Sequence, residues 1–175
     1  RARPVAGTQL LCDKIEKPRR AILVEKNNWP DILQSLQDMR KRLAVSKPQK
    51  SSWDFKNGPG GIQDIELMAQ AIGLYRQCYK TSIREQIISG MEDGHFIEED
   101  LKYLIQSYTL LTKGRILHRL MCVAEGRISE IGTGGKLRLE KIINLEPSEV
   151  FDEVILGIRE RCADIISNLL TKSKR

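Results

Sequence analysis

Two carboxylates, Asp64 and Glu66, directly follow a glycine-rich turn that reads Asn-Gly-Pro-Gly-Gly from residue 57 to residue 61. Carboxylates bind divalent cations such as Mg²⁺, and they also complement the positive end of a helix dipole. Residues two apart lie about 200° around a regular helix, so the two acids cannot share one face. Two interpretations stay open: acids in a helix's first turn, or one acid that points into a site.

The glycine turn itself invites a phosphate-binding interpretation, because such turns often lead into a helix whose N-terminus holds an anion. No Lys-Ser or Lys-Thr follows it, so it is not a P-loop. No apolar strand precedes it, as a dinucleotide-binding turn requires. Gly60 and Gly61 are instead expected to supply unusual backbone angles and a close approach where the helix starts, with Gly58 in the same turn.

Histidine and cysteine predict no further site. His95 and His118 have no partner at a spacing that indicates a nucleophile or a metal site. The cysteines form no C-x-x-C pair, which argues against zinc and favours reduced thiols. They are Cys12, Cys78, Cys122 and Cys162, and we expect the last three to lie in helices. The sequence thus predicts no catalytic residue and no metal site in this chain.

Composition places the chain among compact globular proteins of the cytoplasm. It has 175 residues, 41% of them hydrophobic and 30% charged, and no apolar run approaches the about 20 residues that span a bilayer. The first residues, RARPVAG, contain no methionine and no apolar signal core, and they look like part of a longer protein.

The net charge of +6 raises the alternative of a nucleic-acid binder. Aromatic residues make up only 5% of the chain, which leaves little surface for stacking bases. The basic runs 17–20, 40–42 and 172–175 are expected at helix ends and between helices. The pattern therefore does not favour nucleic acid as a partner.

Hydrophobic spacing predicts helices throughout. We expect a helix from Asn28, capped by Asn27 or Asn28, that ends at residues 46–48; a largely apolar helix over 62–75; and a short helix capped by Thr81 or Ser82. A long helix is expected over about 98–124, with these residues on its core face: Leu101, Leu104, Ile105, Tyr108, Leu111, Ile116, Leu120 and Val123.

The C-terminal third is expected to contain a loop over 126–135, a helix or extended piece over 136–144, and a final helix that starts at 147–149 with Val150 on its apolar side. The predicted fold is an all-α helical bundle with a long central helix and short helix–helix loops. We divide it into residues 1–52, a segment and first helix, and residues 53–175, a bundle that the glycine turn opens.

The order RARPVAG, then DMRKRLA, then WDFKNGPGGIQDIELMAQ resembles the helical region after the second nucleotidyltransferase core of bacterial glutamine synthetase adenylyltransferase. The matching motif positions are Trp53-Asp54-Phe55-Lys56, Gly60-Gly61, Asp64-Ile65-Glu66 and Gln70. A related form of the motif occurs in the PII-uridylyltransferase. Leu67 stands where the family usually has an aromatic residue, and Gln63 where the enzyme's other half often has arginine.

The resemblance implies a role in nitrogen regulation. The family's catalytic signature, Gly-Ser followed by paired aspartates, is absent from this sequence, so the chain is expected to be inactive alone and to need no cofactor itself. The parent enzyme is expected to use ATP and Mg²⁺, with glutamine synthetase, the PII signal protein and its own nucleotidyltransferase core as partners. The resemblance also implies that the glycine turn packs toward that core, which brings Asp64 and Glu66 near the nucleotide. The alternative is a free-standing helical interaction module without enzymatic activity.

Overall fold

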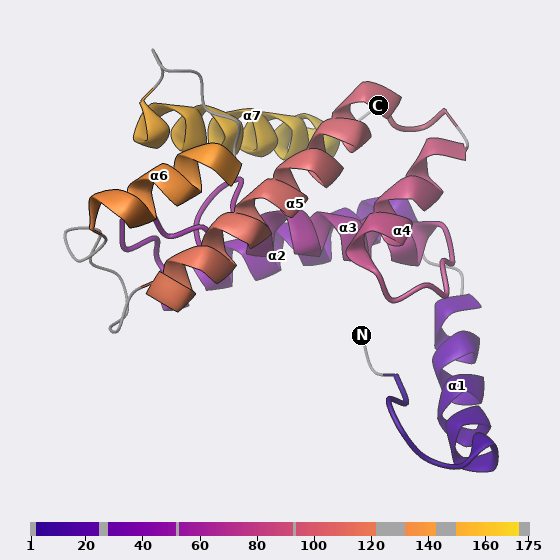
Figure 1. The fold of residues 1–175 in the computed structure, drawn as a ribbon. Coiled ribbons are helices and arrows are strands. Elements are labelled where there is room, and N and C mark those ends of the chain that lie inside the picture. Colours follow the sequence, from indigo (N-terminus) through magenta and orange to yellow (C-terminus); the bar gives the residue numbers. More distant parts are fainter. Residues whose placement is uncertain are drawn as a thin grey trace.

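A computed structural model of the chain describes residues 3–24, 28–51, 53–92, 94–121, 132–142 and 150–171. Within these ranges the regular structure is entirely helical, as predicted (Figure 1). The elements are α1 (Gln9–Val24), α2 (Trp29–Ser46), α3 (Ile62–Tyr75), α4 (Ile83–Ile88), the 3₁₀ turn η1 (Ser89–Glu92), α5 (Glu98–Met121), α6 (Thr133–Ile142) and α7 (Phe151–Thr171).

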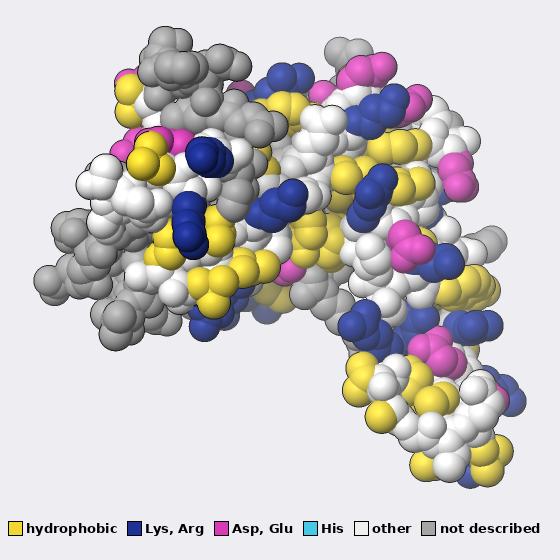
Figure 2. All heavy atoms as spheres, in the orientation of Figure 1, with side chains coloured by type: hydrophobic (Ala, Val, Ile, Leu, Met, Phe, Trp, Pro, Cys, Tyr) yellow, Lys and Arg dark blue, Asp and Glu magenta, His cyan; other side chains and the backbone are white. Residues whose placement is uncertain are grey.

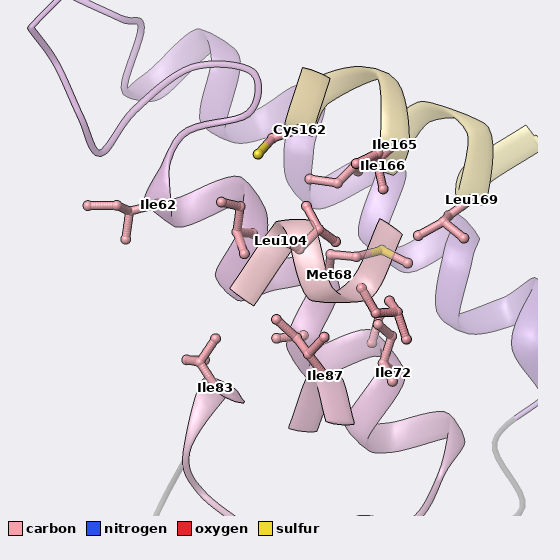
Figure 3. Close-up of a cluster of buried hydrophobic side chains, with 14 of the residues drawn as sticks. Ile62, Met68, Ile72, Ile83, Ile87, Leu104, Cys162, Ile165, Ile166 and Leu169 are labelled. Carbon is pink, nitrogen blue, oxygen red and sulfur yellow. The ribbon is translucent and has the colours of Figure 1, made fainter. Parts of the chain in front are cut away.

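Helix α3 lies at the centre of the bundle and contacts α2, α4, α5 and α7. Its residues Ile65, Met68 and Ile72 are fully buried, because apolar residues cover most of its circumference rather than a single stripe. Figure 3 shows Met68 and Ile72 of α3 beside Leu104 of α5 and the apolar side of α7. The long central helix is thus α5, while the most buried one is α3.

Helix α2 begins and ends where the sequence predicts. The Asn28 side chain accepts a hydrogen bond from the backbone N–H of Asp31 at 2.9 Å, and Pro30 occupies the first turn. Lys47 caps the other end through its backbone N–H. The buried residues of α2 are Trp29, Ile32, Leu33 and Leu36, which join the same core as the residues after 53. The division at residue 52 remains a prediction, yet packing unites the two sides.

Helix α1 was not predicted. It continues through Pro18, a residue that disfavours helix interiors, and none of its residues is buried. Figure 1 shows it projecting away from the bundle. The basic runs 17–20 and 40–42 lie inside α1 and α2, so their predicted place at helix ends is wrong. The third run, 172–175, lies outside the described residues.

The core face of α5 was predicted correctly in its first half and wrongly in its second. Leu101, Leu104 and Leu111 are fully buried, but Ile116 and Leu120 are 54% and 77% exposed. In the last turns the small Gly114 and the polar His118 continue the buried face, which an apolar pattern cannot reveal. Val123 and Cys122 lie outside the described residues.

Three smaller predictions need correction. Cys78 follows the end of α3 and is not helical, whereas Cys162 is buried in α7 as expected. Helix α6 begins at Thr133, inside the predicted loop, and the helical alternative for 136–144 is confirmed as far as Ile142. Val150 is 53% exposed and does not lie on the buried apolar side of α7 as predicted. The predicted start of this helix at 147–149 lies outside the described residues.

None of the described helices has the length and apolar character that crossing a membrane demands.

Candidate functional site

The glycine turn uses the first N–H groups of α3 for its own backbone. Ile62 N–H donates to the Phe55 carbonyl and Gln63 N–H to the Lys56 carbonyl, both at 3.0 Å, and Gly61 N–H donates to the Gly58 carbonyl at 3.2 Å. These are the groups that a helix N-terminus would otherwise offer to a phosphate. The turn therefore closes this helix end, which agrees with the sequence argument against a P-loop.

Asp64 is buried and ties the turn to α2. Its carboxylate accepts two hydrogen bonds from Arg40, from Nε at 2.6 Å and Nη2 at 2.9 Å, and one from the backbone N–H of Gly60 at 3.0 Å. The paired geometry is the strong, two-pronged form of an arginine–carboxylate contact. Asp64 thus holds α2, the turn and the start of α3 in one arrangement.

Glu66 points to another side of α3. Its Oε1 accepts a hydrogen bond from the Tyr108 hydroxyl of α5 at 3.3 Å, and its side chain is half-buried. The prediction that the two acids cannot share a face is confirmed, because one contacts α2 and the other contacts α5. No group of three or more histidines, cysteines or acids within the described ranges is arranged to hold a metal ion. The placement of Asp64 and Glu66 near a nucleotide stays a prediction.

Arg159 of α7 is the central residue that sequence reasoning missed. It is 3% exposed and donates hydrogen bonds to the carbonyls of Asp54 at 2.8 Å and Asn57 at 2.7 Å. The same guanidinium also reaches the Pro59 carbonyl at 3.3 Å and the Gln49 side chain at 3.0 Å. Burial lowers the pKa of Arg159, while the charges of Asp54 and Asp64 oppose that shift.

A sequence signal for Arg159 does exist. It sits four residues after Ile155 and three before Cys162, in register with the buried stripe of α7. A charged residue in such a register is either an exception to the core or a partner for buried polar groups. Here it satisfies backbone carbonyls more than 100 residues away in sequence, as the contact to Asn57 shows with its separation of 102.

The glycines make room for α7. Gly60 has φ +65°, and a Cβ there would lie 1.8 Å from the carbonyl oxygen of Arg159. A Cβ on Gly61 would lie 2.8 Å from the Lys56 carbonyl, and Gly58 has φ +84°. The predicted close approach is therefore confirmed at both glycines, and at Gly60 the approaching group is the backbone of the chain's own final helix. The predicted unusual backbone angle is confirmed at Gly60 but is wrong for Gly61, whose φ of −75° is ordinary.

Asp54 completes the arrangement from within the loop. Burial favours its neutral form, but hydrogen bonds from Asn57 and from the N–H groups of Lys50 and Lys56 outweigh that effect and lower its pKa. Next to it, the Trp53 ring stacks on Phe151 of α7, with centroids 4.4 Å apart. We call Arg40, Asp54, Gly60, Asp64 and Arg159 the turn network.

A cleft of about 270 Å³ opens beside the turn network, between α2 and the turn. Its cationic lining residues are Arg40, Lys41 and Lys47, and its floor is apolar. Leu67 lines this cleft and also a second hollow of about 370 Å³ between α2 and α3. The cationic lining residues belong to the first hollow, whereas the charged lining residue of the second is Asp31.

Comparison with known families decides where these features belong. A family model described as GlnD PII-uridylyltransferase matches residues 33–142, which include the whole turn network except Arg159. The chain belongs to the GlnD PII-uridylyltransferase family. The match runs from within α2 to the end of α6, so it includes the glycine turn and leaves out α7.

Curated relatives carry the name bifunctional glutamine synthetase adenylyltransferase/adenylyl-removing enzyme. The relative from Idiomarina loihiensis is 31% identical over 118 residues, which cover 63% of this chain and 12% of the relative. The one from Rhizobium meliloti is 39% identical over 74 residues, 42% of this chain and 8% of the relative. The one from Hahella chejuensis is 33% identical over 124 residues, 63% of this chain and 13% of the relative.

The resemblance inferred from the glycine–acid motif is therefore confirmed. The matched region spans about an eighth or less of these relatives' length. No solved structure was found to match the chain.

Proposed function

We propose that this chain is a helical domain of a glutamine synthetase adenylyltransferase and supports adenylyl transfer and removal without supplying catalytic groups. The family match and the named relatives support the enzyme class. The division of Asp64 and Glu66 between two sides of α3 carries the non-catalytic part of the proposal. Two carboxylates that diverge in this way cannot clamp one Mg²⁺ between them.

The turn network gives the support a physical form. Arg159 and Asp64 tie Gln49 and the backbone of residues 54–60 to α7 and α2. A turn tied in this way can hold a neighbouring nucleotidyltransferase core in a productive position, because small displacements of reacting groups slow a reaction greatly. Asp64 is then a positioning residue, and Glu66 is the acid proposed to face the active site.

The wider assembly that we propose includes the parent enzyme's catalytic core and its protein partners. ATP and Mg²⁺ are bound by the nucleotidyltransferase core of the parent enzyme, and glutamine synthetase and the PII protein are its partners. The cations Lys41 and Lys47 beside the turn add positive potential to this face. Such potential favours approach of acidic surfaces or nucleotides.

An adenylylation assay tests the division of labour. Glutamine synthetase, Mg²⁺ and ATP labelled on the α-phosphate are incubated with the 175-residue chain alone, or with the longer enzyme that contains it. We expect labelled glutamine synthetase only with the longer enzyme. Label transferred by the chain alone would overturn the non-catalytic assignment. An interaction module would instead be indicated if the longer protein also transfers no label.

A further inference from the structure

The cleft of about 270 Å³ beside the turn network has an excess of positive charge. Its charged lining residues are Arg40, Lys41, Lys47 and Asp64. The Asp64 carboxylate is buried and already accepts hydrogen bonds from Arg40 and from the backbone N–H of Gly60. No further acid lines the cleft, so the positive charge of the two lysines is not balanced there.

The donors of the cleft have few partners within the described ranges of the chain. Lys47 forms no ion pair with any residue in these ranges, and the contact of Lys41 with Asp38 is long at 3.9 Å and exposed on both sides. The Nη1 group of Arg40 and the side chain of Gln63 likewise donate no hydrogen bond to a described residue. These cationic and amide groups are therefore available to an anion from outside the chain.

The rest of the lining is apolar and consists of Leu43, Ala44, Pro59 and Leu67, together with Gly58. A cation near the end of α2 also complements the dipole of that helix, but the dipole does not account for apolar residues left uncovered beside it. A ligand that combines negative charge with an apolar side chain would use both parts of the lining.

The size of the cleft limits what it can hold. Pockets that enclose a whole small molecule measure about 300–1,000 Å³, and this cleft lies below that range at about 270 Å³. Lys41 and Lys47 are separated by about 9 Å along α2, at about 1.5 Å per residue. Acids on either side of one residue in an extended peptide lie about 7 Å apart, a difference that long lysine side chains can bridge. The cleft thus fits a short acid–apolar–acid segment better than a nucleotide.

We propose that this cleft binds an acidic segment of a protein partner. One apolar side chain of the segment lies on the floor between Leu43 and Leu67, and the carboxylates that flank it bind Lys41 and Lys47. Arg40 keeps its contact with Asp64 and adds its Nη1 donors at the edge of the cleft. Such docking does not depend on the role of the domain in adenylyl transfer, because every proposed contact lies on this chain.

A two-dimensional NMR titration of the ¹⁵N-labelled 175-residue chain measures this binding and locates it. The probe is the capped peptide Glu-Glu-Leu-Glu-Glu. We expect shifts of the backbone amide signals of residues 40–47 and 58–67, with a dissociation constant below about 1 mM at low salt that rises as salt is added. Replacing the four acids of the peptide with glutamine, or its leucine with serine, should each raise the dissociation constant at least fivefold.

Matched variants on α2 separate the cleft from general attraction. Lys47→Glu should raise the dissociation constant at least fivefold, and Ala44→Phe, which fills the cleft from an exposed position, should do the same. The controls are Arg42→Glu and Val45→Phe, because Arg42 and Val45 are also exposed on α2 but do not line the cleft. Each control should change the constant less than twofold, and circular dichroism verifies that all four variants keep their helix content.

Three results would overturn the proposal. One is the absence of shifts at peptide concentrations of several millimolar. Another is an equal effect of Arg42→Glu and Lys47→Glu, which would show diffuse attraction to a basic surface. The third is a citrate titration that shifts the same signals with equal affinity, combined with equal binding of the serine peptide, which would make the cleft a site for small anions. A failure of adenylyl transfer with intact peptide binding would count against the proposed function alone.

Discussion

Replacement of Arg159 by leucine tests the turn network most severely. The side chain keeps a similar apolar stem, but the carbonyls of Asp54, Asn57 and Pro59 lose their donor together. Each buried polar group left without a partner costs about 1–3 kcal/mol. The Pro59 contact is long at 3.3 Å and the loop can admit some water, so we expect a total loss of about 3–5 kcal/mol in the free energy of unfolding.

Guanidinium denaturation followed by far-UV circular dichroism gives the free energy of unfolding. It also gives the slope of that free energy against denaturant concentration, which shows whether the unfolding transition has changed. Arg161→Leu is the matched control on the same helix. Arg161 is exposed, and its guanidinium lies over the Tyr103 ring at 4.0 Å, a contact with a value of about 0.5–1 kcal/mol. If Arg159→Leu lowers the free energy of unfolding by no more than Arg161→Leu does, α7 does not hold the glycine turn in place.

Two further predictions concern the turn and the core. Gly60→Ala should destabilise the protein by several kcal/mol more than Gly94→Ala in thermal melts. The two glycines have φ +65° and +68°, but only at Gly60 would the new Cβ meet a backbone oxygen, at 1.8 Å. Equal losses of stability would mean that only the strain of the positive φ matters. Burial lowers the pKa of His118 from 6.5, so the unfolded chain gains a proton first as the pH falls. Stability should thus be full above about pH 6.5 and decline as the pH falls toward the folded-state pKa, and His118→Leu should flatten this decline; His95→Gln shows whether the second histidine carries it instead.

Local signals sufficed for much of the fold. The start of α2 could be predicted because Asn28 caps and Pro30 pre-sets the first turn, both short-range effects. The high proportion of apolar residues from Ile62 to Tyr75 predicted a buried helix. Such features depend on residues within a few positions of one another, and the sequence displays them directly.

Long-range polar contacts were the part that could not be predicted. Arg159 meets Asn57 across 102 residues, and no periodicity links the two. The end of the α5 core face was predicted wrongly for a related reason. Gly114 is buried against the Phe55 ring, which would lie 3.0 Å from a Cβ at this position. Helix α1 was not predicted; it contains Pro18, which disfavours a helix interior, and none of its residues is buried, although Arg19 donates a hydrogen bond to the Tyr79 carbonyl.

We propose that Glu66 lies on the surface through which the domain supports adenylyl transfer, and that Asp64 holds this surface in shape. The most direct measurement is the rate of adenylyl transfer to glutamine synthetase by the longer enzyme carrying Glu66→Gln, with Glu99→Gln, an exposed acid at the start of α5, as its control. We predict a loss of at least tenfold for Glu66→Gln at an unchanged melting temperature, and wild-type rates for Glu99→Gln. Full activity in Glu66→Gln would contradict the claim and reduce the motif to a scaffold for the helical bundle.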